Sequence, residues 1–162
     1  MTISIELSLA HMDWAEQVFY AQLAEIPTEL FAAHYGNPEW TVSIMAQHIA
    51  NGAQWYEYCL TGVRVPTPAA PHSADDVMAL RTFLHDRAQI LIAQASEAED
   101  YLHVDEGDGT FFDVLRSTLL VQAVQHSVEH RAQIACALEA NGYRGINLDD
   151  IDAWAFAAAQ RA

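Results

Sequence analysis

Apolar residues recur every three or four positions along most of the chain, which is the spacing of one face of an α-helix. In the first segment this stripe consists of Leu7, Ala10, Trp14, Val18 and Ala21. No strand-like alternation of useful length interrupts the pattern. The pattern therefore predicts long helices over residues 4–26, 41–60, 73–97 and 110–140, and short helical segments over 31–35 and 149–160.

Capping residues support three of the predicted helix starts. Thr41 is a good N-cap for the second helix, and Ser73 followed by Asp76 resembles a capping box at the third. Thr110 and Asp113 are spaced in the same way at the fourth.

Two long connections separate these helices. Residues 64–72 contain three prolines, and residues 99–109 are acidic and irregular, so both are predicted to cross the ends of the helices. We therefore predict an all-α fold, a four-helix bundle with long crossover connections and a short C-terminal helix, formed by residues 1–162 as a single domain.

Composition restricts the classes of partner. The formal net charge is -15, and the 7 basic residues are all arginine. Such a chain repels phosphate backbones and anionic lipid, so no nucleic-acid or membrane partner is expected. The N-terminus has no basic region typical of a signal peptide. The two cysteines, Cys59 and Cys136, are far apart, which favours reduced thiols and a cytoplasmic location.

Three histidines are candidates for a metal site. His126 and His130 are spaced i, i+4, which places two imidazoles one turn apart on one helix face. His48 lies on the apolar stripe of the second predicted helix, between Ile44 and Trp55. Two imidazoles from one helix and one from another can meet in the core of a bundle, where unpaired ring nitrogens would be unfavourable.

Such a site would leave at least one coordination position open, as catalytic metal sites do. The ion would then lower the pKa of a bound water or thiol and orient a small-molecule substrate. Imidazole suits Zn, Ni, Fe or Cu, and the ligand type does not choose among them.

Three stretches of the sequence resemble motifs of a known protein family. They are HMDWAEQVF in the first helix, PEWTVSIMAQHIANGAQWY in the second and VQAVQHSVEHRAQIACALEANGY in the last long helix. Their order and spacing resemble the DinB/YfiT superfamily of metal-binding bundles. The second stretch is nearest to the branch that includes mycothiol-dependent maleylpyruvate isomerase.

The resemblance implies the same three metal ligands, His48, His126 and His130. His126 stands where the isomerase branch has a glutamate, which moves the site toward the three-histidine form. Ala132 stands where many members have glycine. The resemblance also implies Zn or Ni, with Fe as a further option, a homodimer, and thiol S-transfer with a low-molecular-weight thiol cofactor.

Four further residues are candidates for the surroundings of the metal. Gln133 lies close to the helix face that carries His126 and His130, and it could hold a metal ligand in place. An ordinary packed amide is the simpler interpretation. Glu129 lies beside both ligands in the sequence but points away from the midline between them, and it could act as a general base by reaching round the pocket. His11 and Trp55 could line a pocket or simply pack in the core.

Three functions remain open from the sequence. The first is a metal-dependent enzyme of the thiol S-transferase or isomerase type. The second is a non-catalytic metal-binding or stress-response protein of the same fold. The third is a plain helical bundle with packed histidines and no metal.

Overall fold

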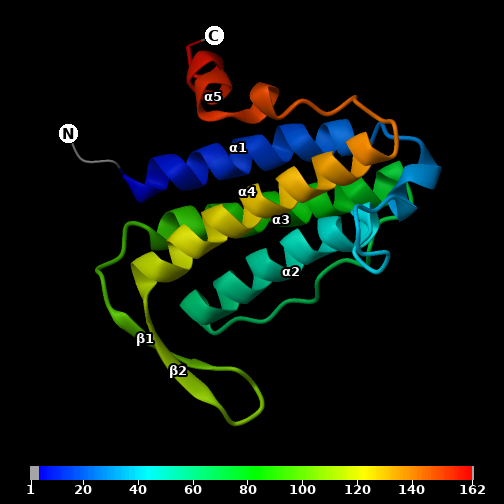
Figure 1. Ribbon diagram of the computed structural model, residues 1–162. Helices are drawn as coiled ribbons and strands as arrows, with labels where there is room; N and C mark the ends of the chain where they lie inside the picture. The colour runs from blue at the N-terminus through cyan, green and yellow to red at the C-terminus, as the bar shows by residue number, and fades with distance from the viewer. Residues whose placement is uncertain (1–3, 162) are drawn as a thin grey trace.

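The computed structural model describes residues 4–161, most of which are helical (Figure 1). The long helices are α1 (Ile5–Leu23), α2 (Val42–Thr61), α3 (Ala74–Gln94) and α4 (Arg116–Ala140). The shorter ones are η1 (Thr28–Ala32), η2 (Leu148–Ile151) and α5 (Ala153–Ala159).

Local capping explains where the first three long helices begin. The side-chain oxygens of Ser4, Thr41 and Ser73 each accept a hydrogen bond from the backbone N–H three residues later. Gly62 ends α2 in the left-handed conformation, with φ of 74°. The predicted starts at Thr41 and Ser73 are therefore confirmed.

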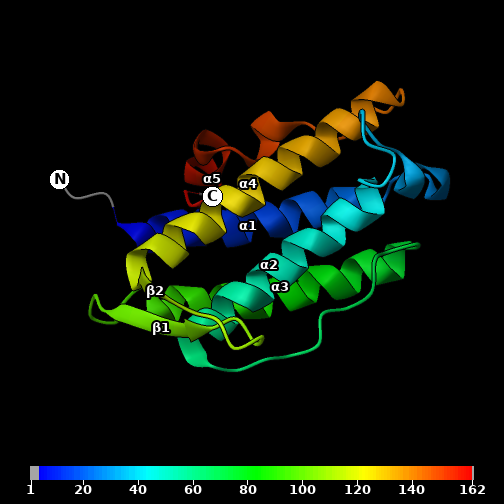
Figure 2. The same ribbon diagram turned by 60° about the horizontal axis from the view of Figure 1, so that its bottom comes forward.

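The long helices are arranged so that α1 and α2 each pack against both α3 and α4 (Figures 1 and 2). Their shared core contains large, fully buried side chains, including Phe19, Tyr20, Leu23, Met45, Ile49, Leu80, Leu84, Ile134 and Leu138. All four long helices contribute side chains to this core. Packing against α1 and α3 therefore fixes the position of α2 relative to α4.

The connection between α2 and α3 runs back along the length of the helices (Figure 2). The Ser43 hydroxyl donates to the carbonyl of Pro71 (2.7 Å), and the Gln47 amide donates to that of Pro68 (2.9 Å). These bonds hold the proline-rich connection against the first turns of α2.

A β-hairpin corrects the all-α prediction. Strands β1 (Tyr101–Asp105) and β2 (Phe111–Leu115) pair antiparallel, with Tyr101 opposite Leu115. The fold is therefore mostly helical with one small two-stranded sheet, and α4 begins at Arg116 rather than at Thr110. Every second strand residue packs on the apolar end of the helices, and these residues are Leu102, Val104, Phe112 and Val114.

The residues that resembled a helix cap have other partners in the hairpin. The Thr110 hydroxyl bonds the Asp108 carboxylate, and Asp113 lies 2.8 Å from the Nδ1 of His103 on the opposite strand. The structure therefore has two short strands where the sequence pattern predicts an irregular connection followed by a helix cap.

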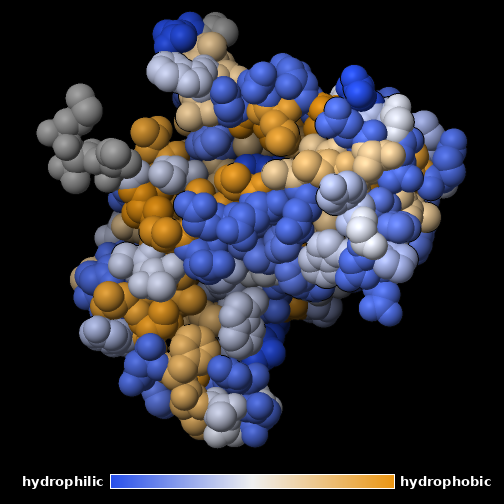
Figure 3. Space-filling view, viewed as in Figure 1, coloured by the Kyte–Doolittle hydropathy of each residue, from blue (hydrophilic) through white to orange (hydrophobic). Residues whose placement is uncertain are grey.

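The hairpin is anchored at one end of the long helices. The Tyr58 hydroxyl donates to the carbonyl of Asp105 (3.0 Å), and the Arg64 guanidinium lies 3.8 Å from the centroid of the Tyr58 ring. Apolar surface remains exposed on the hairpin, where the side chain of Phe111 is 54% exposed (Figure 3).

The C-terminal segment lies across the outer face of α1 (Figure 1). The Nε2 of His11 is 2.8 Å from the carbonyl oxygen of Ile151, and the Trp14 and Phe156 ring centroids are 5.5 Å apart. Within residues 4–161, no helix is long and apolar enough to span a membrane.

Candidate metal centre

Three histidines meet where α2 and α4 pack together. His48 comes from α2, and His126 and His130 come from successive turns of α4. One ring nitrogen from each lies within 4.8 Å of the others. The ring centroids are 4.4 to 4.8 Å apart. The structure thus brings together the three residues that the sequence pattern singled out.

The donor set fits one divalent ion. Imidazole nitrogens bind Zn at about 2.0–2.1 Å, so two nitrogens on one ion lie at most about 4.2 Å apart. Separations of up to 4.8 Å therefore need only small ring movements to close on an ion. Three neutral nitrogens would complete three coordination positions and leave others to solvent or substrate.

The cluster is half-buried at the surface rather than in the core expected from the sequence. All three histidines are partly exposed, and Ile44, one turn before His48, is 39% exposed. The core face of α4 is formed instead by Leu119, Ala123, Ile134 and Ala137. The rings of His126 and His130 turn sideways from that face toward His48 on α2. Their partial exposure leaves the centre accessible.

Burial and mutual proximity keep two of the imidazoles neutral. Desolvation first, and then the neighbouring His130 and His48, lower the pKa of His126 to about 4. Desolvation and His130 also lower the pKa of His48. Both rings therefore present free lone pairs near neutral pH, which metal ligation requires.

A glycine in α2 makes room for His126. A Cβ placed on Gly52 would lie 2.4 Å from Cε1 and 2.7 Å from Nδ1 of His126. Glycine inside a helix costs about 1 kcal/mol relative to alanine. The absence of a side chain at this position therefore allows the His126 ring to lie against α2.

Gln133 orients His130. Its Oε1 is 2.8 Å from Nδ1 of His130 and accepts a hydrogen bond of 3.1 Å from the indole N–H of Trp40. An amide oxygen only accepts, so the Nδ1 of His130 must carry the proton, and the unprotonated Nε2 keeps the lone pair that would bind a metal. The Trp40 ring also lies against His48, at 4.9 Å between centroids.

The chain matches the model of the DinB family over residues 1–161. It belongs to the DinB family. No curated protein and no solved structure matches it.

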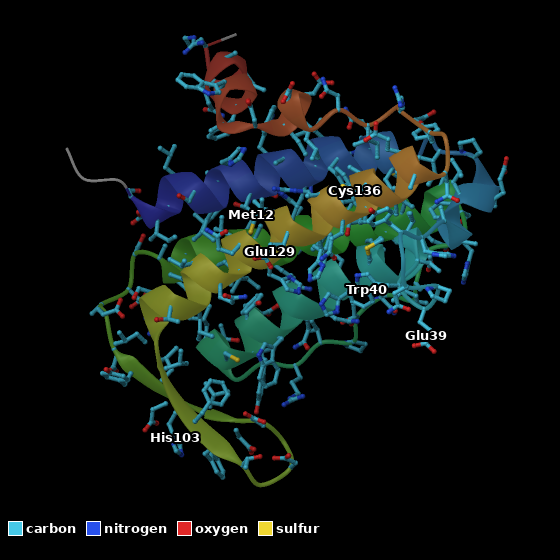
Figure 4. The ribbon with its side chains drawn as sticks, in the orientation of Figure 1. Met12, Glu39, Trp40, His103, Glu129 and Cys136 are labelled. Carbon is cyan, nitrogen blue, oxygen red and sulfur yellow. The ribbon has the colours of Figure 1, made fainter. Side chains whose placement is uncertain are left out.

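Of the four further candidate residues of this DinB chain, Gln133 alone bonds a cluster histidine within the described range 4–161. Glu129 is exposed on α4 (Figure 4). Burial is the main cause that raises the pKa of the neighbouring Tyr56, and the charge of Glu129 adds to it. His11 faces the C-terminal segment, and Trp55 packs on Tyr58, with ring centroids 5.6 Å apart.

A buried polar group of the DinB chain lies behind the centre. Glu16 of α1 accepts a hydrogen bond of 2.5 Å from the hydroxyl of Ser127, and the guanidinium of Arg131 donates to the carbonyl of Met12 (3.4 Å). Burial raises the pKa of Glu16 to about 7, although Arg131 and Ser127 oppose the shift. Glu16 and His126 line the same small cavity of about 10 Å³.

Sequence reasoning missed three contributors to the DinB site. Trp40 precedes the predicted cap of α2, and its role depends on contact with α4. Gly52 carried a usable signal, because it is a helix-interior glycine one turn after His48. Glu16 carried another, because it is an acid between buried apolar positions of α1.

Proposed function

We propose that this DinB-family protein holds one divalent metal ion through His48, His126 and His130 and is a metal-dependent enzyme acting on a small molecule. The observation that carries the proposal is the convergence of three ring nitrogens within 4.8 Å. Without an ion, three clustered imidazoles would leave lone pairs on their ring nitrogens short of partners.

The chain's own residues would prepare the centre before a metal arrives. Gln133 fixes the tautomer of His130, and the lack of a side chain at Gly52 leaves room for the His126 ring. A bound divalent ion would supply Lewis acidity and lower the pKa of a water or thiol at its open position. Zn and Ni are the proposed ions, with Fe as a further option, because imidazole donors suit all three.

The proposed reaction is thiol S-transfer or an isomerisation that uses a low-molecular-weight thiol. Its support is the resemblance of the second helix to the mycothiol-dependent isomerase branch. The chain itself offers no poised thiol at α2, because burial raises the pKa of Cys59 to about 11. The thiol would therefore come from the substrate or the cofactor.

The wider organisation belongs to the same proposal. The four long helices would form a four-helix bundle with crossover connections, and residues 1–162 a single domain. The protein would act in the cytoplasm as a homodimer without a nucleic-acid or membrane partner. A net charge of -15 supports the last point.

A metal titration tests the ligand set. Zn and Ni dissociation constants would be measured by chelator competition for wild type and for His48→Ala, His126→Ala and His130→Ala. Each change should weaken binding by about 100-fold or more, since one of three donors is lost. His72→Ala, an exposed histidine outside the cluster, should change nothing. Equal affinities in all variants would refute the site.

An activity screen tests the reaction class. Metal-loaded protein would be incubated with small electrophiles and several thiols, and turnover should disappear in His130→Ala. Tight metal binding with no turnover for any pair would refute the enzyme and favour the non-catalytic function.

A further inference from the structure

A cavity of about 370 Å³ opens beside the histidine cluster. It is lined by Tyr35, Trp40, Met45, Ala132, Gln133 and Cys136. These residues come from the segment before α2, from α2 itself and from α4. A volume above about 300 Å³ is typical of pockets that hold small organic molecules.

The cavity and the metal centre share two walls. Trp40 and Gln133 line the cavity, and the same two side chains contact His130, Trp40 at 5.8 Å between ring centroids. Figure 4 shows Trp40 and Cys136 on the same side of the molecule, with Glu39 projecting away from them. A molecule in the cavity would therefore lie one side chain away from the histidines.

The chemistry of the walls selects uncharged molecules. The lining residues of the described chain include no arginine and no acid, and most of the surface they offer is apolar. A carboxylate or phosphate held by these walls alone, without a metal ion at the histidines, would lose water without gaining a cationic partner. The net charge of -15 adds long-range repulsion of anions.

We propose that this cavity binds the apolar part of a neutral small molecule, most simply an aromatic one, beside the metal centre. Tyr35 and Trp40 line the cavity with aromatic side chains, which pack well against an aromatic ligand. The inference names the substrate class of the proposed enzyme and rests on the proposed function for its link to the metal. Binding itself depends only on the cavity.

Two probes of one shape test the class. Equilibrium dialysis would compare neutral 2-naphthol with the anion 2-naphthoate on metal-free and on Zn-loaded protein. Naphthol should bind in both forms, and on metal-free protein naphthoate should bind about tenfold more weakly or worse. Equal binding of the two probes to metal-free protein, or no binding of naphthol, would overturn the inference.

Two variants and one internal reporter locate the probe. Ala132→Leu fills the cavity and should weaken naphthol binding by about tenfold, whereas Ala135→Leu on the same helix, outside the lining, should leave it unchanged. In wild type, naphthol should slow the alkylation of exposed Cys136 by N-ethylmaleimide. If naphthol binds equally well to Ala132→Leu and does not slow the alkylation of Cys136, the probe binds elsewhere and the proposed location is refuted.

The outcomes separate this inference from the proposed function. If the protein binds naphthol but takes up no metal, the inference about the cavity stands and the proposed metal-dependent enzyme is rejected. If the protein takes up metal but does not bind naphthol, only the inference about the cavity is rejected. Self-association that Ala132→Leu abolishes, with no naphthol binding, would assign the cavity to a second copy of the chain and would also overturn the inference.

Discussion

At the scale of single residues, the candidate centre depends on side chains that position the ligands as well as on the ligands. His130 receives its orientation from Gln133, and Gln133 is itself held by the indole of Trp40. Such partners around metal ligands commonly affect affinity strongly, because they fix the tautomer and the ring plane.

Replacing Gln133 with leucine tests this positioning role. The change removes the acceptor for the Nδ1 proton of His130, so the ring becomes free to rotate or to change tautomer. We expect metal affinity to fall roughly 10- to 100-fold in a chelator competition. Gln125→Leu, an exposed position on the same helix, is the matched control. Equal affinities in the two variants would show that Gln133 is merely packed.

Gly52→Ala separates helix stability from site geometry. Alanine should favour the helix by about 1 kcal/mol, but its methyl group would meet the His126 ring at 2.4 Å. Because the ring is the movable partner, we expect the unfolding midpoint to change little while metal affinity falls about tenfold or more. Exposed Asn51→Ala serves as control. Unchanged metal affinity in Gly52→Ala would contradict the close approach.

The sequence could predict the three histidines because their spacing is local and their residue type is chemically specific. It could not predict their half-buried position, since the angle at which α2 meets α4 is set by packing across the molecule. Trp40 was missed for the same reason, because its partners His130 and Gln133 lie about ninety residues later in the chain.

At the scale of elements, the long helices followed from the apolar spacing, but the buried face of α1 did not. The predicted stripe includes Leu7, which is 60% exposed, whereas Leu9, Met12 and Phe19 are buried. α1 is apolar on two sides because the C-terminal segment covers Trp14 and His11 from outside. A helix that is covered on two sides has two apolar faces, and the spacing of apolar residues alone does not show which face is the more deeply buried.

The hairpin was missed because its strands are only five residues each and adjoin an acidic, glycine-containing turn. Its side chains alternate as a strand requires, but so short an alternation competes poorly with the helical pattern on either side. What holds the hairpin is again distant in sequence, since Tyr58 and Arg64 belong to α2 and to the connection after it.

Arg64→Ala should loosen the hairpin without affecting the metal centre. The guanidinium stacks on Tyr58, a contact worth about 0.5–1 kcal/mol at a partly exposed site. We expect faster hydrogen exchange at the amides of residues 101–115 and unchanged metal affinity. Arg144→Ala removes an arginine that is exposed elsewhere and should leave exchange in the hairpin as in wild type. A lower metal affinity in Arg64→Ala, but not in Arg144→Ala, would contradict the separation of the two regions.

At the scale of the whole molecule, Glu16 makes stability depend on pH. In the unfolded chain its pKa is near 4.5, whereas burial raises the folded value to about 7. Between these values the folded state keeps a proton that the unfolded state has lost. The contribution of Glu16 to the free energy of unfolding is therefore fully present below about pH 4.5 and is lost as pH rises through about 7.

Glu16→Gln should remove this part of the pH dependence. Urea unfolding of metal-free protein would be compared at about pH 5 and about pH 8. Wild type should lose stability relative to Glu16→Gln as pH rises, because contributions from other groups cancel in the difference. Exposed Glu25→Gln should run parallel to wild type. A constant difference between Glu16→Gln and wild type would show that Glu16 stays ionised in the fold.

The metal content of the intact protein tests the central claim most directly. Protein purified without a chelating tag would be analysed by elemental mass spectrometry, with wild type and His126→Ala compared at equal concentration. The account predicts about one equivalent of a divalent metal in wild type and its loss in His126→Ala. Metal-free wild type that also fails to take up added Zn or Ni would contradict it.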